Sequence, residues 1–141
     1  MRLNREARSC LIRCMHERVL RFLVIDDEPR AGAMISELLR DLGHSCVVES
    51  RGTAALTRAA ELMPDVVLTE LVLPDITGFD LARELRAQFG GALVLVATTN
   101  WETRGDRERA AAAGFDAYLE KPANPARLQR LVLDAEASLP N

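Results

Sequence analysis

The sequence predicts an α/β fold, a doubly wound parallel sheet of five strands in the order 2-1-3-4-5 with five helices. From residue 21 onward, short apolar runs that suit buried parallel strands alternate five times with segments of helical spacing. Such alternation favours a parallel sheet with helices on both faces. Right-handed crossovers then leave few topologies, and five units match this doubly wound order.

Turn-forming residues separate the predicted elements. Gly43, Gly90 and Gly114 each follow a helical segment, as residues that end helices do. Pro64 ends the second helical segment, because proline disfavours helix at the residue before it. Pro125 suits the first turn of the last helix. In chain order we expect a strand at 21–27, helix 30–42, strand 45–50, helix 53–63, strand 65–73, helix 79–89, strand 92–99, helix 105–113, strand 117–120 and helix 125–138.

The chain divides by charge into an arm and a domain. Residues 1–21 hold six arginines against two glutamates, a net charge of +4. Because the whole chain has a net charge of −3, the remaining residues must carry −7. We therefore assign residues 1–20 to a basic N-terminal arm, either helical or disordered, and 21–138 to one domain. No further domain is expected, so we expect a stand-alone domain that acts by contacting another protein.

Composition narrows the class of protein. A net charge of −3 with a pI near 5.4 disfavours nucleic acid as the main partner. No apolar run approaches the roughly 18 residues of a membrane helix, and the N-terminus lacks the apolar core of a signal peptide. Cys10, Cys14 and Cys46 include no CxxC pair, which fits a reducing cytoplasm.

Polar residues gather where the predicted strands end. Asp26 and Asp27 end the first strand, Glu70 lies near the end of the third, and Lys121 follows the fifth. Ligands of doubly wound sheets lie beyond the carboxyl ends of the strands, so these groups should meet there. Adjacent carboxylates repel unless a cation is present, and a hard divalent ion such as magnesium, or Lys121, can supply the charge.

A hydroxyl group completes this predicted site. Thr98 and Thr99 end the fourth strand, and either hydroxyl can bond a phosphoryl oxygen. A metal ion, a lysine and a hydroxyl around one carboxylate are suited to stabilising a phosphoryl group in transfer.

Three segments resemble the receiver domain of bacterial two-component response regulators. FLVIDDEP resembles the opening strand with its acidic pair, and PDVVLTELVLPDITGFDL resembles the third strand and its loop. GDRERAAAAGFDAYLEKP resembles the fourth helix and the fifth strand with a Lys–Pro ending. The resemblance spans about residues 21–138 and implies a cytoplasmic, flavodoxin-like signalling domain of a phosphorelay, not an enzyme.

The resemblance also implies a role for each residue of the site. Asp26, Asp27, Glu70 and the backbone carbonyl of Val72 would hold Mg²⁺, while Lys121 would pair with the phosphoryl group or the acceptor carboxylate. Tyr118 falls where the family carries an aromatic that changes rotamer. Counting back from Gly114 and Lys121 selects Thr99 as the switch hydroxyl, whereas the local sequence VATTN favours Thr98.

The phospho-acceptor position departs from the family pattern. The family has aspartate there and this chain has Glu70, with Pro64 and Pro74 at the expected spacing on either side. The longer side chain predicts poor phosphorylation and a partial imitation of the phosphorylated state. Two alternatives remain: Glu70 still accepts a phosphoryl group from a histidine kinase, or the switch has decayed and the domain only binds partners.

The resemblance also names partners. A histidine kinase or a downstream signalling protein would bind the domain, without nucleic acid or membrane. The fourth helix, fifth strand and fifth helix would form the signalling or homodimer face. Trp101 is either a loop aromatic packed on a helix or part of a partner surface. The charged residues expected on that face are Arg107, Glu108, Glu120, Arg127 and Arg130.

Overall fold

The computed structural model describes residues 4–5, 18–100 and 104–139. Most of the basic arm and Trp101 lie outside the described residues, so the predictions on them stay predictions. The strands are β1 (Arg21–Ile25), β2 (Ser45–Glu49), β3 (Val66–Glu70), β4 (Val94–Thr99) and β5 (Ala117–Glu120). The helices are α2 (Pro29–Asp41), α3 (Gly52–Leu62), α4 (Gly78–Phe89), the short 3₁₀ helix η1 (Gly90–Ala92), α5 (Arg104–Ala113) and α6 (Pro125–Ser138).

The five strands form one parallel sheet in the order β2-β1-β3-β4-β5, which confirms the predicted topology. Strands β1, β3 and β4 lie inside the sheet and are almost wholly buried, as their continuous apolar runs predict. Strands β2 and β5 form the two edges and are partly exposed.

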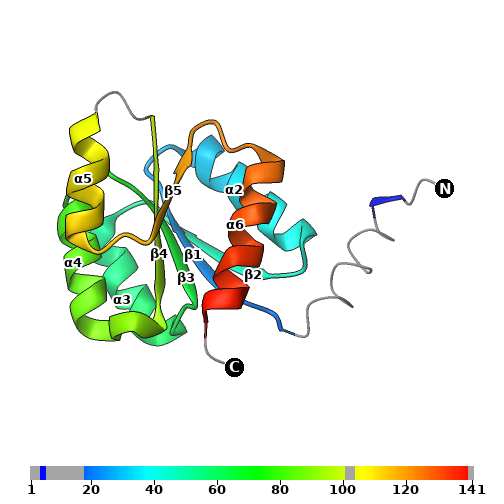
Figure 1. Ribbon diagram of the computed structural model, residues 1–141, viewed down its shortest axis with the longest axis horizontal. Coiled ribbons are helices and arrows are strands. Elements are labelled where there is room, and N and C mark those ends of the chain that lie inside the picture. Colours follow the sequence, from blue (N-terminus) through cyan, green and yellow to red (C-terminus); the bar gives the residue numbers. More distant parts are fainter. Residues whose placement is uncertain (1–3, 6–17, 101–103, 140–141) are drawn as a thin grey trace.

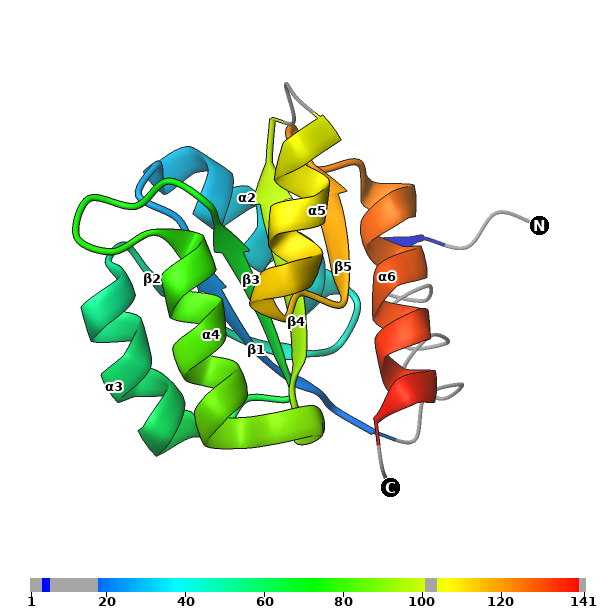
Figure 2. The ribbon, with the colours of Figure 1, turned by 60° about the vertical axis from the view of Figure 1, so that its left-hand side comes forward.

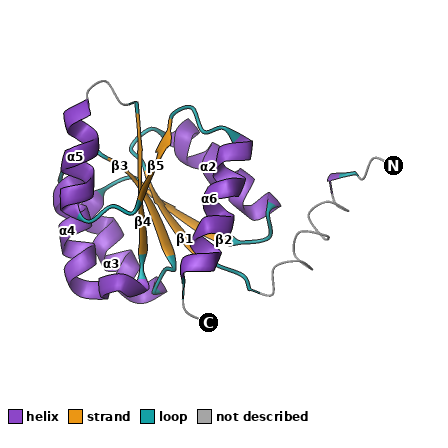
Figure 3. Ribbon diagram, in the orientation of Figure 1, coloured by secondary structure: helices purple, strands orange, loops and turns teal. Residues whose placement is uncertain are grey.

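Helices cover both faces of the sheet, so the molecule has three layers (Figure 1). Helices α3, α4 and α5 lie on one face and α2 and α6 on the other, as the rotated view and the colouring by secondary structure also show (Figures 2 and 3). The space between the sheet and each helix layer holds its own cluster of apolar side chains, because successive side chains of a strand point to opposite faces. Leu23 and Leu95 belong to the first cluster, and Val24 and Val96 to the second.

Side-chain caps fix where the helices begin. Glu28 caps α2 by accepting a hydrogen bond from the Ala31 N–H at 2.7 Å. The Thr77 hydroxyl accepts from the Asp80 N–H at 3.1 Å and caps α4. Asn124 caps α6 by accepting from Ala126 N–H at 2.9 Å. Each cap satisfies an N–H that the first turn of a helix leaves without a partner.

Many observed boundaries differ from the predicted ones by one or two residues, and the end of the third strand differs by three. The third strand ends at Glu70 rather than at 73, because the chain turns away there and residues 71–77 form the loop before α4. The second helix ends at Leu62, since Met63 adopts a left-handed conformation with φ of 51°. Among residues 4–5, 18–100 and 104–139, no helix has the length and apolar content needed to cross a bilayer.

Candidate functional site

Lys121 lies between two carboxylates at the carboxyl end of the sheet. Its ammonium is 2.5 Å from Asp26 Oδ2 and 2.5 Å from Glu70 Oε2. The three side chains come from the ends of β1, β3 and β5, which parallel pairing brings to one edge. All three are largely buried, with exposed side-chain fractions of 1% for Asp26, 13% for Glu70 and 17% for Lys121. The structure thus brings these residues together.

The charges of this cluster do not balance, because one ammonium faces two carboxylates. Burial is the largest single influence on Lys121 and lowers its pKa, but hydrogen bonds to Asp26 and Glu70 and attraction to their charges together outweigh it. The pKa of Lys121 is therefore raised above its ordinary value. Lys121 is accordingly charged at neutral pH and holds both anions.

Backbone N–H groups orient the two carboxylates. Asp26 Oδ1 accepts a hydrogen bond from the Glu28 N–H at 2.9 Å, just before α2 begins. Glu70 Oε1 accepts from the Leu71 N–H at 2.9 Å and the Val72 N–H at 3.4 Å. Each carboxylate therefore gives one oxygen to the backbone of the loop that follows its strand and the other to Lys121.

The loop after Glu70 is anchored to α3 by Asp75. Its carboxylate accepts hydrogen bonds from the N–H groups of Gly52 and Thr53, both at 2.9 Å, and from the Thr53 hydroxyl at 2.6 Å. The Thr53 hydroxyl is the main reason that the pKa of Asp75 lies well below its usual range. At the other end of the loop, a side chain on Gly78 would overlap the carbonyl oxygen of Glu70. Sequence reasoning missed this anchor, because 23 residues separate Gly52 from Asp75 and no local motif links them.

The residues that the resemblance assigns to a metal ion do not converge. Asp27 is exposed, whereas its neighbour Asp26 is buried. In the part of the chain that the structure describes, no three His, Cys, Asp or Glu side chains are grouped to hold a metal ion. Lys121 pairs with both buried carboxylates, so a metal ion would have to compete with its ammonium for them. Magnesium binding therefore stays a prediction.

The two candidate threonines differ in their position relative to Glu70. In the β3–β4 ladder Thr98 pairs with Glu70, whereas Thr99 pairs with Glu120 of β5. Paired residues point to the same face of a sheet, so Thr98 shares the face of Glu70 and Thr99 points to the other. The register thus favours Thr98 over Thr99, which residue counting preferred. Both side chains are buried, and the Thr99 carbonyl accepts a hydrogen bond from the Lys121 N–H at 3.1 Å.

Comparison with known proteins identifies the family. The model of the response regulator receiver domain matches residues 22–133. The DNA-binding response regulator MtrA of Mycobacterium tuberculosis is 39% identical over 108 residues, which cover 77% of this chain and 46% of that protein. This chain thus spans about half the length of the curated relatives it matches.

The chain belongs to the response regulator receiver domain family.

Solved structures agree with this assignment. The BeF₃-activated N-terminal receiver domain of Klebsiella pneumoniae RstA is 31% identical, with a TM-score of 0.75 over 82% of this chain and 97% of that one. The chemotaxis response regulator CheY4 of Vibrio cholerae has a TM-score of 0.77 at 24% identity, over 84% of this chain and 99% of that one. The CheY4 match supports the fold alone. Together they confirm the receiver fold that the sequence predicts.

Tyr118 lies at the edge of this receiver domain. Tyr118 is 41% exposed, and the guanidinium carbon of Arg107 lies 5.3 Å from the centroid of its ring. Arg107 also lies 3.4 Å from Glu120, which is 3.9 Å from Arg127. The outer surface of α5, β5 and α6, here called the α5–β5–α6 face, is thus linked by a chain of exposed ion pairs.

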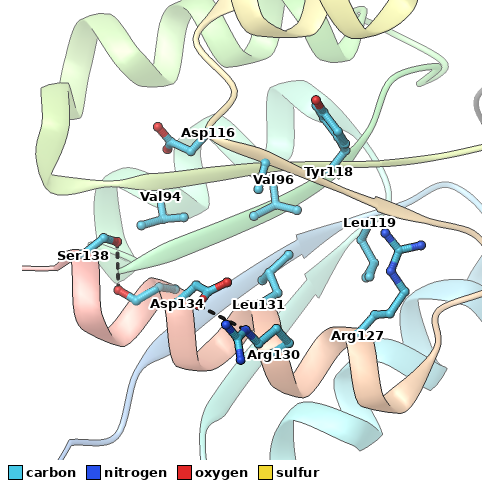
Figure 4. Close-up of a pocket in the computed structure, with 12 residues that line it drawn as sticks. Val94, Val96, Asp116, Tyr118, Leu119, Arg127, Arg130, Leu131, Asp134 and Ser138 are labelled. Atoms are coloured by element: carbon cyan, nitrogen blue, oxygen red, sulfur yellow. Dashed lines mark hydrogen bonds and ion pairs between the residues drawn. The ribbon is translucent and has the colours of Figure 1, made fainter.

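A pocket of about 460 Å³ opens on this face between the edge of the sheet and α6 (Figure 4). Val96, Leu119 and Leu131 give it an apolar floor, and Arg130 and Asp134 form an ion pair at 3.5 Å at its rim. An apolar floor within a charged rim is typical of protein-binding surfaces.

Proposed function

We propose that this receiver domain signals without phosphorylation, with Glu70 as a built-in imitation of the phosphorylated residue. The observation that carries the proposal is the 2.5 Å contact between Glu70 Oε2 and the ammonium of Lys121. By the family resemblance, Lys121 is the residue that pairs with the phosphoryl group or with the acceptor carboxylate. A permanent anion on Lys121 supplies the charge that a phosphoryl group would otherwise bring.

The geometry of Glu70 also disfavours phosphoryl transfer. The extra methylene of glutamate moves its carboxylate about 1.5 Å farther along the side chain than that of aspartate. Transfer depends on in-line geometry, and a misplacement of about 1 Å can cost on the order of a hundredfold in rate. Glu70 Oε1 is moreover engaged by two loop N–H groups and Oε2 by Lys121. Before either Glu70 oxygen could attack phosphorus, it would have to break its contact with the loop N–H groups or with Lys121.

The domain would act in the cytoplasm by binding a histidine kinase or a downstream signalling protein. We place the point of contact, with a partner or with a second copy in a homodimer, on the α5–β5–α6 face. Its charged rim and apolar floor support this choice. The relative MtrA is named as a DNA-binding protein, but its matched part spans only 46% of that protein. We therefore assign binding of protein, rather than of nucleic acid, to this domain.

Exposure to acetyl phosphate with magnesium, followed by intact mass, tests whether Glu70 is an acceptor. Acceptance would join a Glu70 oxygen to phosphorus, break the bond from phosphorus to the bridging oxygen and release acetate. We expect no adduct on the wild type while Glu70→Asp gains one phosphoryl group. An adduct on the wild type that Glu70→Gln abolishes would establish the conventional alternative instead.

A second comparison separates imitation from a decayed switch. Backbone amide spectra and self-association of the wild type are compared with Glu70→Gln, which keeps the shape and removes the charge. We expect shifts at Thr98, Lys121 and Tyr118 and a change in dimer affinity. Glu84→Gln on exposed α4 is the matched control. If the spectrum of Glu70→Gln differs from that of the wild type no more than the spectrum of the control does, the switch has decayed.

A further inference from the structure

An acidic groove runs along α2 beside the edge strand β2, away from the α5–β5–α6 face. Its volume is about 700 Å³. Among the described residues that line it, the one cation is Arg40, which donates a hydrogen bond to the Cys46 carbonyl at 2.9 Å. The other charged residues that line it are the carboxylates Asp26, Glu37, Asp41 and Glu49. This α2–β2 groove therefore has an excess of negative charge.

A cation from a distant part of the chain already occupies the end of the groove near the C-terminus of α2. Arg5 forms an ion pair with Asp41 and a second with Glu37 at 3.6 Å. Arg5 lies 36 residues before Asp41, so the contact is not a consequence of local sequence. Helical spacing places Glu37 and Asp41 four residues apart on one face of α2, where a single guanidinium can reach both.

The charge of the whole chain supports the same contact. Residues 1–21 carry +4 and the rest of the chain −7. Among the acids of the groove, Glu49 is already paired with Arg58 at 3.4 Å, and Asp26 with Lys121. Glu37 and Asp41 are the acids of the groove that contact Arg5.

We propose that the α2–β2 groove is a docking surface for the basic N-terminal segment of the same chain, with Arg5 anchored on Glu37 and Asp41. The groove extends along α2 as far as Asp26, so Glu37 and Asp41 lie on the same surface as the site. Release of the segment would free this acidic surface for a basic partner. The inference does not depend on whether Glu70 imitates a phosphoryl group.

Trypsin cleavage of the full-length protein tests the proposal. Trypsin cleaves after an arginine only when the guanidinium enters its own acidic pocket, so Arg5 must first leave Asp41. Two exposed ion pairs predict that Glu37→Lys/Asp41→Lys speeds cleavage after Arg5 about fivefold at low salt. In about 1 M salt, where charges are screened within a few ångströms, the wild type should approach the variant. Mass spectrometry of the released peptide gives the rate.

Two controls make the result decisive. Glu84→Lys/Asp134→Lys places the same charge change on α4 and α6, and should leave the cleavage rate after Arg5 unchanged. Glu37→Gln/Asp41→Asn repeats the test without adding positive charge. Equal cleavage rates in the wild type and both groove variants would overturn the proposal. Protection that rises with protein concentration would also overturn it, because the groove would then hold the segment of a second copy.

Discussion

The two ends of the sheet both hold charged side chains, but they balance them differently. At the carboxyl end, Lys121 is the one cation among the described residues that pairs with Asp26 and Glu70. At the amino end, Arg86 of α4 donates hydrogen bonds to the carbonyls of three residues and pairs with Asp116 at 2.7 Å. The three carbonyls belong to Gly90, Leu93 and Gly114.

The difference separates a structural cluster from a functional one. The amino-end cluster, Arg86 with Asp116, matches one cation to one anion and ties α4 to the segments that lead into β4 and β5. The carboxyl-end cluster, Asp26, Glu70 and Lys121, keeps one negative charge in excess in a largely buried place. Such an excess costs stability, and strained or unbalanced groups gather where proteins function.

Removal of Lys121 should give the largest effect and should depend on pH. Lys121→Met leaves two carboxylates facing each other, so we expect the free energy of unfolding to fall by about 2–3 kcal/mol at neutral pH. One carboxylate of the variant can take up a proton as the pH falls, so the loss should shrink below about pH 5. Urea unfolding at several pH values measures this. A loss that is the same at every pH would contradict the charge excess.

The wild type should show no comparable pH dependence from this cluster above neutral pH. The pKa of Lys121 is raised, so its contribution is fully present below the ordinary value of 10.5. The contribution is lost only as the pH rises through the higher value of the folded state. Wild-type stability that declined between about pH 7 and 9, and did not decline in Lys121→Met, would disprove this assignment.

Removal of Arg86 should give a smaller loss that is independent of pH. Arg86→Ala leaves partly buried carbonyls of Leu93 and Gly114 without their donor, which predicts a loss of about 2 kcal/mol. Between about pH 5 and 8 the loss should stay constant, because Asp116 still accepts from the Leu95 N–H at 2.8 Å. Arg83→Ala, which removes only an exposed pair with Asp80, is the control and should change stability by less than about 0.5 kcal/mol.

Sequence reasoning found the carboxyl-end cluster but not the amino-end one. Asp26, Glu70 and Lys121 end parallel strands, and such ends must meet at one edge, so their proximity follows from topology. Arg86 lies within a helix, where an arginine is ordinarily solvated, and nothing local shows that loop carbonyls surround it. The choice between Thr98 and Thr99 could not be fixed either, because one inserted residue reverses the face on which a strand residue lies.

Magnesium binding should distinguish the two clusters, because Mg²⁺ would compete with Lys121 at the carboxyl end only. A divalent cation and Lys121 compete for Asp26 and Glu70, so we expect weak binding to the wild type. Lys121→Met should bind Mg²⁺ about tenfold more tightly, because the carboxylates lose their only described ion-pair partner. Isothermal titration calorimetry gives the affinities, with Arg86→Ala as a control of unchanged affinity. Equal affinity in wild type and Lys121→Met would show that Lys121 does not compete.

The smallest effect should come from the anchor beside the carboxyl-end cluster, where Asp75 holds the loop after Glu70 against α3. Asp75→Asn keeps the size and removes the charge that the Thr53 hydroxyl and two N–H groups favour. We expect faster hydrogen exchange at the Gly52, Thr53, Leu71 and Val72 amides, with exchange in the amino-end cluster unchanged.

The sign of the pH dependence follows from the same anchor. The pKa of Asp75 is lowered, so its stabilisation is present above the ordinary value of 3.8 and is lost as the pH falls below it. Acidification should therefore speed exchange at these amides in the wild type, relative to reference amides of α6, and not in Asp75→Asn. If Leu71 and Val72 exchange at wild-type rates in the variant, the anchor holds α3 alone and the Glu70 loop is positioned by Gly78 and by its own hydrogen bonds to Glu70.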